Sequence, residues 1–178
     1  MQTHEGELIQ KCRRGDGAAL ADLVDLHQAA VYGLARHMLG DPEEAGDVFQ
    51  TVFLRLFERL EQIEPERGAR AWLRKTPLNE CLDRIKARSR TEESVDGDAL
   101  ESTREEPPDA AEGCEVQQAL RQALDALPPR RRAAVVLRYT EDLSYREIAK
   151  VLGVSVETVR SALKRARLEL RRRLQRYY

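Results

Sequence analysis

The chain has 178 residues, 34% of them charged, and a formal net charge of −1 at pH 7. This length allows one domain or two small ones, and the net charge by itself indicates no nucleic-acid partner. The three cysteines are scattered, so neither a disulfide framework nor a cysteine–histidine metal site is expected. The polar N-terminus is unlike a signal peptide, and no apolar run approaches the roughly 20 residues of a membrane span. We therefore expect a cytoplasmic protein.

The charges are distributed unevenly along the chain. Residues 1–66 carry 6 basic and 13 acidic side chains, whereas residues 67–90 carry 8 basic and 2 acidic ones. Residues 91–115 are again acidic, with 1 basic against 10 acidic, and residues 128–178 are basic, with 14 against 5. Two basic segments separated by an acidic one indicate two surfaces that face a polyanion such as DNA.

Helical patterns dominate the first 90 residues. Leu8, Ile9 and Cys12 predict a short first helix that stops at Gly15, and Asp16 is the predicted N-cap of a second helix. The side chains expected to face inward on this second helix are apolar: Leu20, Leu23, Leu26, Val31, Leu34 and Ala35.

A third helix is predicted to start at Asp41-Pro42-Glu43-Glu44. This run combines a cap, a proline at the first helical position and acids near the positive end of the helix dipole. The helix is expected to end before Pro65. Its apolar stripe, wide enough to contribute to a core, consists of Val48, Val52, Phe53, Leu56, Phe57 and Leu60.

A fourth helix is predicted to run through Trp72 to about Lys86. Pro77 lacks an N–H and clashes with the preceding turn, so we expect a kink or break near Thr76, with a new helix beginning at Leu78. Trp72 is more readily a core residue than a platform for an unpaired base.

Residues 91–114 are rich in charge, proline and glycine and predict a flexible acidic linker. The predicted fold is all-α, with two small helical domains at 1–90 and 115–178. Each is near the lower size limit for an independent core, so both are expected to be mobile without a partner. The helices expected in the second domain cover 115–126, 130–139, 144–152 and 155–176.

The last two of these helices form a predicted helix-turn-helix. Ser144 and Glu147 make a capping box, Gly153 ends the first helix, and Ser155 caps the second. The face of the second helix opposite its apolar stripe carries Val156, Glu157, Arg160, Ser161, Lys164 and Arg165. Such a face can enter a DNA major groove. The alternative is an ordinary helical hairpin with a solvated face, which usually mixes charges of both signs.

Asp47 and Gln50 lie three residues apart on the third helix, and Leu54 continues the same face. The pattern alone favours a solvated polar edge on a core helix. No arrangement of catalytic residues, phosphate loop or histidine cluster stands out. We therefore predict neither an enzyme nor a cofactor.

Motifs along nearly the whole chain resemble those of an extracytoplasmic-function (ECF) sigma factor, a small two-domain specificity subunit of bacterial RNA polymerase. In chain order they are Gly15-Asp16 with Ala19-Leu20; Leu39–Ala45 followed by Asp47–Gln50 and Phe53-Leu54; Ala71-Trp72-Leu73 with Asn79, Leu82 and Asp83; Leu127–Tyr139; and the helix-turn-helix.

The resemblance implies a polymerase-clamp contact by Asp47, Gln50 and Leu54. It implies that the first domain binds the −10 element, partly as single-stranded DNA, and that the second domain binds the −35 element as a duplex. The −10 candidates are Arg70, Arg74, Lys75 and Asn79. The −35 candidates are Val156, Arg160, Ser161, Lys164 and Arg165. Many relatives are held inactive by an anti-sigma factor, which makes such a protein a candidate partner.

Three features depart from the family pattern. Gly46 and Thr51 stand where acids are common, Thr76-Pro77 replaces an apolar–alanine pair, and Glu80 replaces an apolar residue. Promoter melting is therefore the least supported implication. Two other functions stay open from the residues alone: a stand-alone helix-turn-helix regulator, and an adaptor that binds only proteins.

Overall fold

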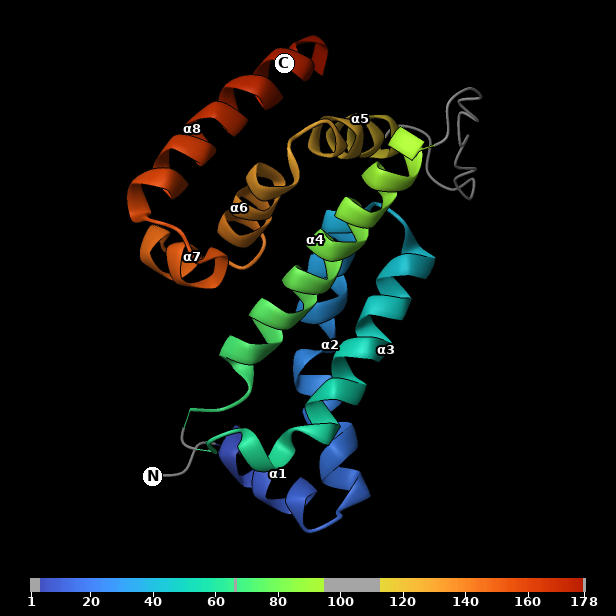
Figure 1. Ribbon diagram of the computed structural model, residues 1–178, viewed down its shortest axis with the longest axis vertical. Coiled ribbons are helices and arrows are strands. Elements are labelled where there is room, and N and C mark those ends of the chain that lie inside the picture. The colour runs from blue at the N-terminus through green and yellow to red at the C-terminus, as the bar shows by residue number, and fades with distance from the viewer. Residues whose placement is uncertain (1–3, 66, 95–112, 178) are drawn as a thin grey trace.

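A computed structural model describes residues 4–65, 67–94 and 113–177 (Figure 1). In these ranges the chain forms helices and no strand, which confirms the all-α prediction. The first half contains α1 (His4–Arg13), α2 (Gly17–Leu39), α3 (Pro42–Glu58), the 3-10 turn η1 (Leu60–Gln62) and α4 (Arg70–Ser94). The second half contains α5 (Gly113–Asp125), α6 (Pro129–Tyr139), α7 (Tyr145–Leu152), α8 (Val156–Arg173) and the 3-10 turn η2 (Gln175–Tyr177).

Local capping signals set the starts of α2 and α3, as predicted. The Asp16 carboxylate accepts hydrogen bonds from the backbone N–H groups of Ala18 and Ala19, at 3.0 and 3.2 Å. The Asp41 carboxylate does the same for the first turn of α3, with Pro42 at its start. These bonds satisfy N–H groups that have no partner inside the helix.

The predicted inward face of α2 is correct except at one position. Leu23, Val31, Leu34 and Ala35 are buried, and Leu20 packs partly against the core, but Leu26 is 51% exposed. The buried position in this turn belongs to the next residue, His27, whose Nε2 lies 3.0 Å from the Glu5 carboxylate of α1. A polar residue occupies the core side here because α1 brings it a hydrogen-bonding partner.

A kink or a break was predicted near Thr76; the break is wrong, because α4 continues through Pro77 and reaches Ser94, and the kink stays a prediction. Thr76 caps no helix, and no new helix begins at Leu78. Pro77 lies on the buried side of α4 together with Leu73, Leu78 and Cys81. Burial of this face offsets the backbone hydrogen bond that Pro77 cannot donate.

The linker predicted at 91–114 overlaps two helices. Residues 91–94 belong to α4, and residues 113 and 114 begin α5. The remainder, 95–112, lies outside the described residues. The division into domains at 90 and 115 stays a prediction.

The two halves of the molecule share one core. A single cluster of buried side chains extends from Leu8 in α1 to Ala166 in α8. α6 packs on α2 and α4, and α7 packs on α4, so that α6 and α7 lie along one side of α4 and α3 along the other (Figure 1). Arg132 of α6 is buried within this contact and donates to the Met38 carbonyl of α2, at 2.6 Å. The two predicted domains are therefore packed against each other in this structure.

Candidate nucleic-acid and polymerase interfaces

The helix-turn-helix forms as its capping residues predict. The backbone N–H of Glu147 donates to Ser144 Oγ at 3.3 Å, and the Ser144 N–H donates to the Glu147 carboxylate at 2.8 Å. Hydrogen bonds from Ser144 also lower the pKa of Glu147. Gly153 ends α7 with φ of 65°, and Ser155 Oγ accepts the Thr158 N–H at the start of α8. The turn and both caps are fixed by residues within 15 positions of one another, counted from Ser144 to Thr158.

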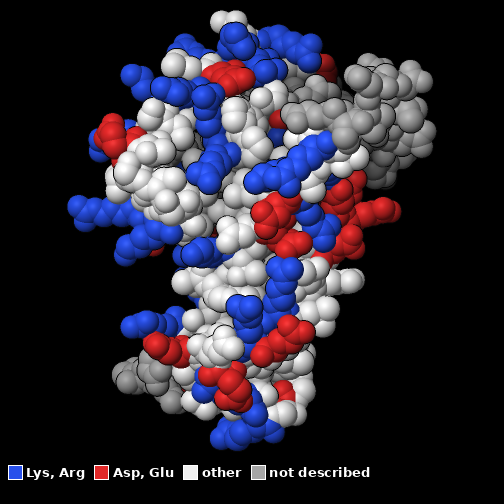
Figure 2. Space-filling view, in the orientation of Figure 1, with Lys and Arg blue, Asp and Glu red and all other residues white. Residues whose placement is uncertain are grey.

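Burial fixes which side of α8 faces solvent. Val159, Leu163 and Ala166 are buried against the rest of the second half. Of the predicted −35 candidates, Arg160, Lys164 and Arg165 are exposed on the other side, and Ser161 is half-buried. Val156 was predicted to lie on this outward face but instead packs partly against the core, because it stands three and seven residues before the buried Val159 and Leu163. Lys and Arg side chains gather over the part of the molecule where α8 lies (Figure 2). This face suits a negatively charged duplex.

Arg160 is held by one neighbour on its own helix. Its Nη1 lies 2.6 Å from the Glu157 carboxylate, three residues earlier, and both side chains are exposed. An exposed pair of this kind contributes little to stability, so Arg160 can exchange its partner for a base or a phosphate at low cost.

Two arginines that we did not single out from the sequence adjoin this face. Arg130 and Arg131, at the start of α6, line a hollow of about 470 Å³ with Ser161 and Arg165 of α8. Arg131 also lies 3.8 Å from the Glu169 carboxylate. The run of basic residues that follows Pro129 could have indicated from the sequence that Arg130 and Arg131 contribute to a DNA-binding surface. Its position beside α8 depends on helix packing.

The predicted −10 candidates on α4 differ in their surroundings. Arg70, Lys75 and Asn79 are exposed. Arg74 faces the second half instead, where its Nε lies 3.5 Å from the Glu141 carboxylate in the loop between α6 and α7. The structure therefore leaves three of the four candidates open to solvent and pairs the fourth with an acid.

Two further arginines of α4 pair with acids, whereas Lys86 and Arg90 are exposed. Arg84 lies 3.4 Å from Glu80 and 3.7 Å from Asp47 of α3, and Arg88 pairs with Glu44 of α3. Glu80 in turn accepts a 2.7 Å hydrogen bond from Arg55. The unusual acid at position 80 thus joins α3 to α4, and acids compensate part of the positive charge of the basic segment 67–90.

The predicted polymerase-contacting residues share one solvent-facing side of α3. Asp47 and Gln50 are exposed, and Leu54 is 62% exposed. The opposite side of the helix buries Val52 and Phe53. A solvent-exposed leucine beside polar groups is a suitable anchor for a protein partner.

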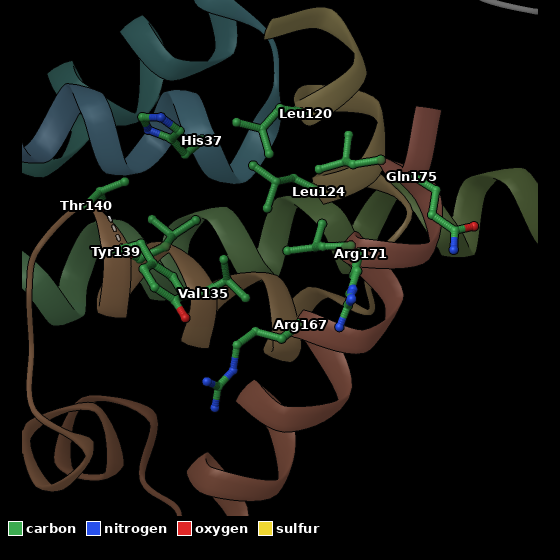
Figure 3. Close-up of a pocket in the computed structure, with 12 residues that line it drawn as sticks. His37, Leu120, Leu124, Val135, Tyr139, Thr140, Arg167, Arg171 and Gln175 are labelled. Carbon is green, nitrogen blue, oxygen red and sulfur yellow. Dashed lines mark hydrogen bonds between the residues drawn. The ribbon is translucent and has the colours of Figure 1, made fainter. Parts of the chain in front are cut away.

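The structure also contains a groove that was not predicted (Figure 3). It has a volume of about 860 Å³ and lies between α5, α6 and α8, with His37 of α2 at one side. Its apolar lining is Leu120, Leu124, Val135, Val136, Leu170 and Leu174. Arg167 and Arg171 add positive charge from α8. The groove was missed because its lining comes from helices that are far apart in the sequence.

The single tryptophan and two of the cysteines lie in or against the core. Trp72 packs partly against the core, in line with its predicted role. Burial raises the pKa of Cys12 and raises that of Cys81 to about 12, so these thiols stay protonated at neutral pH. Within residues 4–65, 67–94 and 113–177, no group of three or more His, Cys, Asp or Glu side chains could hold a metal ion.

Sequence profiles of two consecutive regions match the chain. Sigma-70 region 2 matches residues 23–91, and Sigma-70, region 4 matches residues 117–170. The ECF RNA polymerase sigma factor SigW of Bacillus subtilis is 30% identical over 176 residues, which cover 93% of this chain and 94% of SigW. The chain belongs to the ECF family of RNA polymerase sigma factors. As a member of that family, it binds core RNA polymerase and promoter DNA and directs promoter-specific initiation of transcription.

Further relatives agree with this assignment. The RNA polymerase sigma-E factor of Streptomyces coelicolor is 35% identical over 161 residues, covering 90% of this chain and 88% of that factor. Among solved structures, CnrH in complex with the cytosolic domain of CnrY matches with a TM-score of 0.70 and 26% identity, over 96% of this chain and 97% of the other. The sigma factor RpoE of Bartonella quintana, in complex with the anti-sigma factor NepR, shares the fold, with a TM-score of 0.71 and 24% identity over 87% and 96% of the two chains.

The ECF sigma factor has, in the part of the chain described, no helix long and apolar enough to span a membrane. The match of region 2 as well as region 4 disfavours a stand-alone helix-turn-helix regulator, since such a regulator has no need of the first region.

Proposed function

We propose that this sigma factor works through three surfaces: α3 for the polymerase, α4 for the −10 element and α8 for the −35 element. The main support for the proposal is that α8 exposes its basic side to solvent and buries its apolar side against α6 and α7. We propose further that the protein acts in the cytoplasm and catalyses no reaction itself. Its part in transcription is to position the polymerase.

For the −35 element, Arg160, Lys164 and Arg165 are the proposed cationic contacts. Ser161, which is half-buried, and Val156, which packs partly against the core in the first turn of α8, are the proposed contacts to a base edge or a thymine methyl group. Arg130 is a further candidate for a phosphate contact, because it shares a hollow with Arg165.

For the −10 element, Arg70, Lys75 and Asn79 are exposed along α4 and supply two cations and one amide. Arg74 belongs to the same set in the sequence, but its Nε lies 3.5 Å from the Glu141 carboxylate. Single-stranded DNA is the proposed ligand of α4, because exposed cations along a helix can follow a phosphate backbone.

For the polymerase, Asp47, Gln50 and Leu54 form a polar and apolar patch on α3. The patch is less acidic than the family pattern, since Gly46 and Thr51 replace acids. Leu54 is then the principal anchor, because apolar burial is the largest favourable contribution available at this patch.

Co-purification with core polymerase followed by run-off transcription tests the proposal. We expect the tagged chain to bring down core polymerase and to start transcription from a DNA library at a defined set of promoters. Leu54→Glu should abolish the co-purification while leaving duplex DNA binding by α8 intact. Binding of DNA without any binding of polymerase by the wild-type chain would instead support the stand-alone regulator.

An anti-sigma factor is a further proposed partner. CnrH and the Bartonella sigma factor are each described in complex with a second protein, and both share this fold. The apolar groove with Arg167 and Arg171 beside it offers a site for an amphipathic segment with acidic side chains. Leu120→Glu should weaken such a complex, as measured by pull-down from the native organism.

A further inference from the structure

The loop between α6 and α7 sets one acidic side chain against the proposed −10 helix. The Glu141 carboxylate lies 3.5 Å from Arg74 Nε, and the two side chains are only 12% and 21% exposed. Among the described residues, Arg74 Nε has no hydrogen-bond partner, so its contact with Glu141 is an ion pair. A guanidinium buried to this extent depends on the nearby carboxylate for compensation of its charge.

The loop that carries Glu141 is itself fixed. The Leu143 N–H donates to the Leu137 carbonyl at 3.1 Å, and Arg138 Nη1 donates to the Leu143 carbonyl at 2.9 Å. Asp142 has φ of 47°, a left-handed conformation that residues other than glycine adopt rarely. The position of Glu141 is therefore set by its own loop as well as by its partner on α4.

A second contact, between α6 and α2, also holds the two halves together. Buried Arg132 of α6 donates to the Met38 carbonyl of α2 and also pairs with Asp125, at 2.8 Å. The start of α6 consequently lies beside α4. Asn79 and Lys86 of α4 line a pocket of about 790 Å³ together with Arg130 of α6. A DNA strand that reaches Asn79 in this arrangement has α6 beside it.

We call the arrangement in which α6 and α7 pack on α4 the closed form. In the closed form, the proposed polymerase surface on α3 and the proposed −35 surface on α8 remain exposed to solvent. Asp47 and Leu54 on α3 are exposed, and so are Arg160 and Lys164 on α8. The contact between the halves therefore affects one DNA-binding surface and spares both the other DNA-binding surface and the proposed polymerase surface.

We propose that the Arg74–Glu141 pair is an autoinhibitory contact. In the closed form, Glu141 takes the place of a DNA phosphate at Arg74, and single-stranded −10 DNA binds after the second half has moved away. Carboxylate and phosphate compete because both are anions that are attracted to the same guanidinium. This inference rests on the proposed role of α4 in −10 binding.

The test uses the full chain and matched variants. Glu141→Gln removes the charge that faces Arg74 and keeps the size of the side chain. Asp142→Asn is the control, because it removes the same charge one residue away, from a carboxylate that is 94% exposed and pairs with Arg138. Binding of a fluorescein-labelled, mixed-sequence DNA single strand is measured by anisotropy at low salt, with circular dichroism to verify the fold of each variant.

The closed form lowers apparent affinity in proportion to the fraction of open molecules. If Glu141→Gln raises that fraction from about one tenth to about one half, affinity rises about fivefold. Asp142→Asn should bind as the wild type does. In an Arg74→Ala background, Glu141→Gln should produce no further gain, because the contact is already lost.

Equal affinities of Glu141→Gln and Asp142→Asn would overturn the proposal, as would an equal gain from Glu141→Gln with and without Arg74. The same proteins are tested for co-purification with core polymerase. A wild-type chain that fails to bind polymerase refutes the proposed function, whereas polymerase binding with unchanged DNA affinity refutes the autoinhibitory contact alone.

Discussion

The two helices proposed to bind DNA differ in how their positive charges are held. On α8, Arg160 pairs with an acid three residues away on the same helix, and in the part of the chain described no ion pair involves Lys164 or Arg165. On α4, Arg84 and Arg88 pair with acids of α3, and Arg74 pairs with an acid from the second half. With the same count of basic residues, α8 therefore presents an open positive face, whereas three arginines of α4 are paired with acids from other parts of the chain.

Counting charges along a sequence therefore predicts the charge of a surface well only where the acids that pair with the basic residues are close to them in the sequence. The acids that face α4 lie in α3 and in the loop after α6, between 30 and 70 residues away along the chain. We therefore expect substitutions on α8 to act on DNA binding, and substitutions on α4 to act on DNA binding and helix packing together.

The largest expected effect is on α8. Arg160→Ala should lower run-off transcription from the cognate promoter by about 5- to 150-fold, the equivalent of the roughly 1–3 kcal/mol attributed to a good base contact. Thermal unfolding should be unchanged, since the side chain is exposed. Arg172→Ala, which removes the same charge near the end of α8, is the control and should keep most of the activity. Equal losses in both variants would mean that α8 binds DNA through general charge.

Next is the proline within α4. Pro77→Ala should raise the free energy of unfolding by about 1–3 kcal/mol, because alanine can donate the backbone hydrogen bond that proline lacks. The measurement is urea unfolding followed by circular dichroism, with Thr76→Ala as the control. A loss of stability would indicate that packing of the proline ring outweighs the missing hydrogen bond. Polymerase-dependent promoter opening by the same variant shows whether the proline affects the −10 surface.

A smaller effect is expected at the first helix of the helix-turn-helix. Ser144→Ala should destabilise the protein by about 1 kcal/mol through loss of the N-cap. The hydrogen bond from Ser144 Oγ to the Glu147 carboxylate, the larger of the two that lower the pKa of Glu147, should be lost as well, whereas the backbone N–H of residue 144 can still donate. Because the folded-state pKa is depressed, its contribution is present at neutral pH and disappears as the pH falls below the ordinary glutamate range and through the folded pKa. NMR titration of Glu147 in both proteins measures this, and an unchanged pKa in the variant would contradict it.

The smallest effect is expected at the acid that joins α3 to α4. Glu80→Gln should cost about 0.5 kcal/mol in thermal or urea unfolding, because its ion pairs with Arg55 and Arg84 are partly exposed to solvent. Glu58→Gln on the exposed part of α3 is the control for loss of one charge. If both variants behave alike, position 80 has no special part in the α3–α4 contact.

Prediction from the sequence succeeded where the relevant residues are neighbours. Asp16, Asp41 and Ser144 cap the helices they were predicted to cap, because an N-cap bond spans two or three residues. The break at Thr76 was wrong because the cost of Pro77 was weighed without the burial of the surrounding face. The prediction that Leu26 faces inward was wrong. The helical period does not decide which of two adjacent residues is buried, and here His27 is buried because Glu5 of α1 bonds to it.

By itself, the sequence determined the all-helical fold, the capped helix starts, the capped turn before α8 and the basic outward face of that helix, since each depends on interactions within a few residues. Family membership followed from motifs in register along the chain. Only the tertiary structure decided which basic residues of α4 meet acids, where Glu141 lies, and that α5, α6 and α8 enclose an apolar groove. These features join residues far apart in the chain, and their energies depend on burial and distance, which local patterns do not contain.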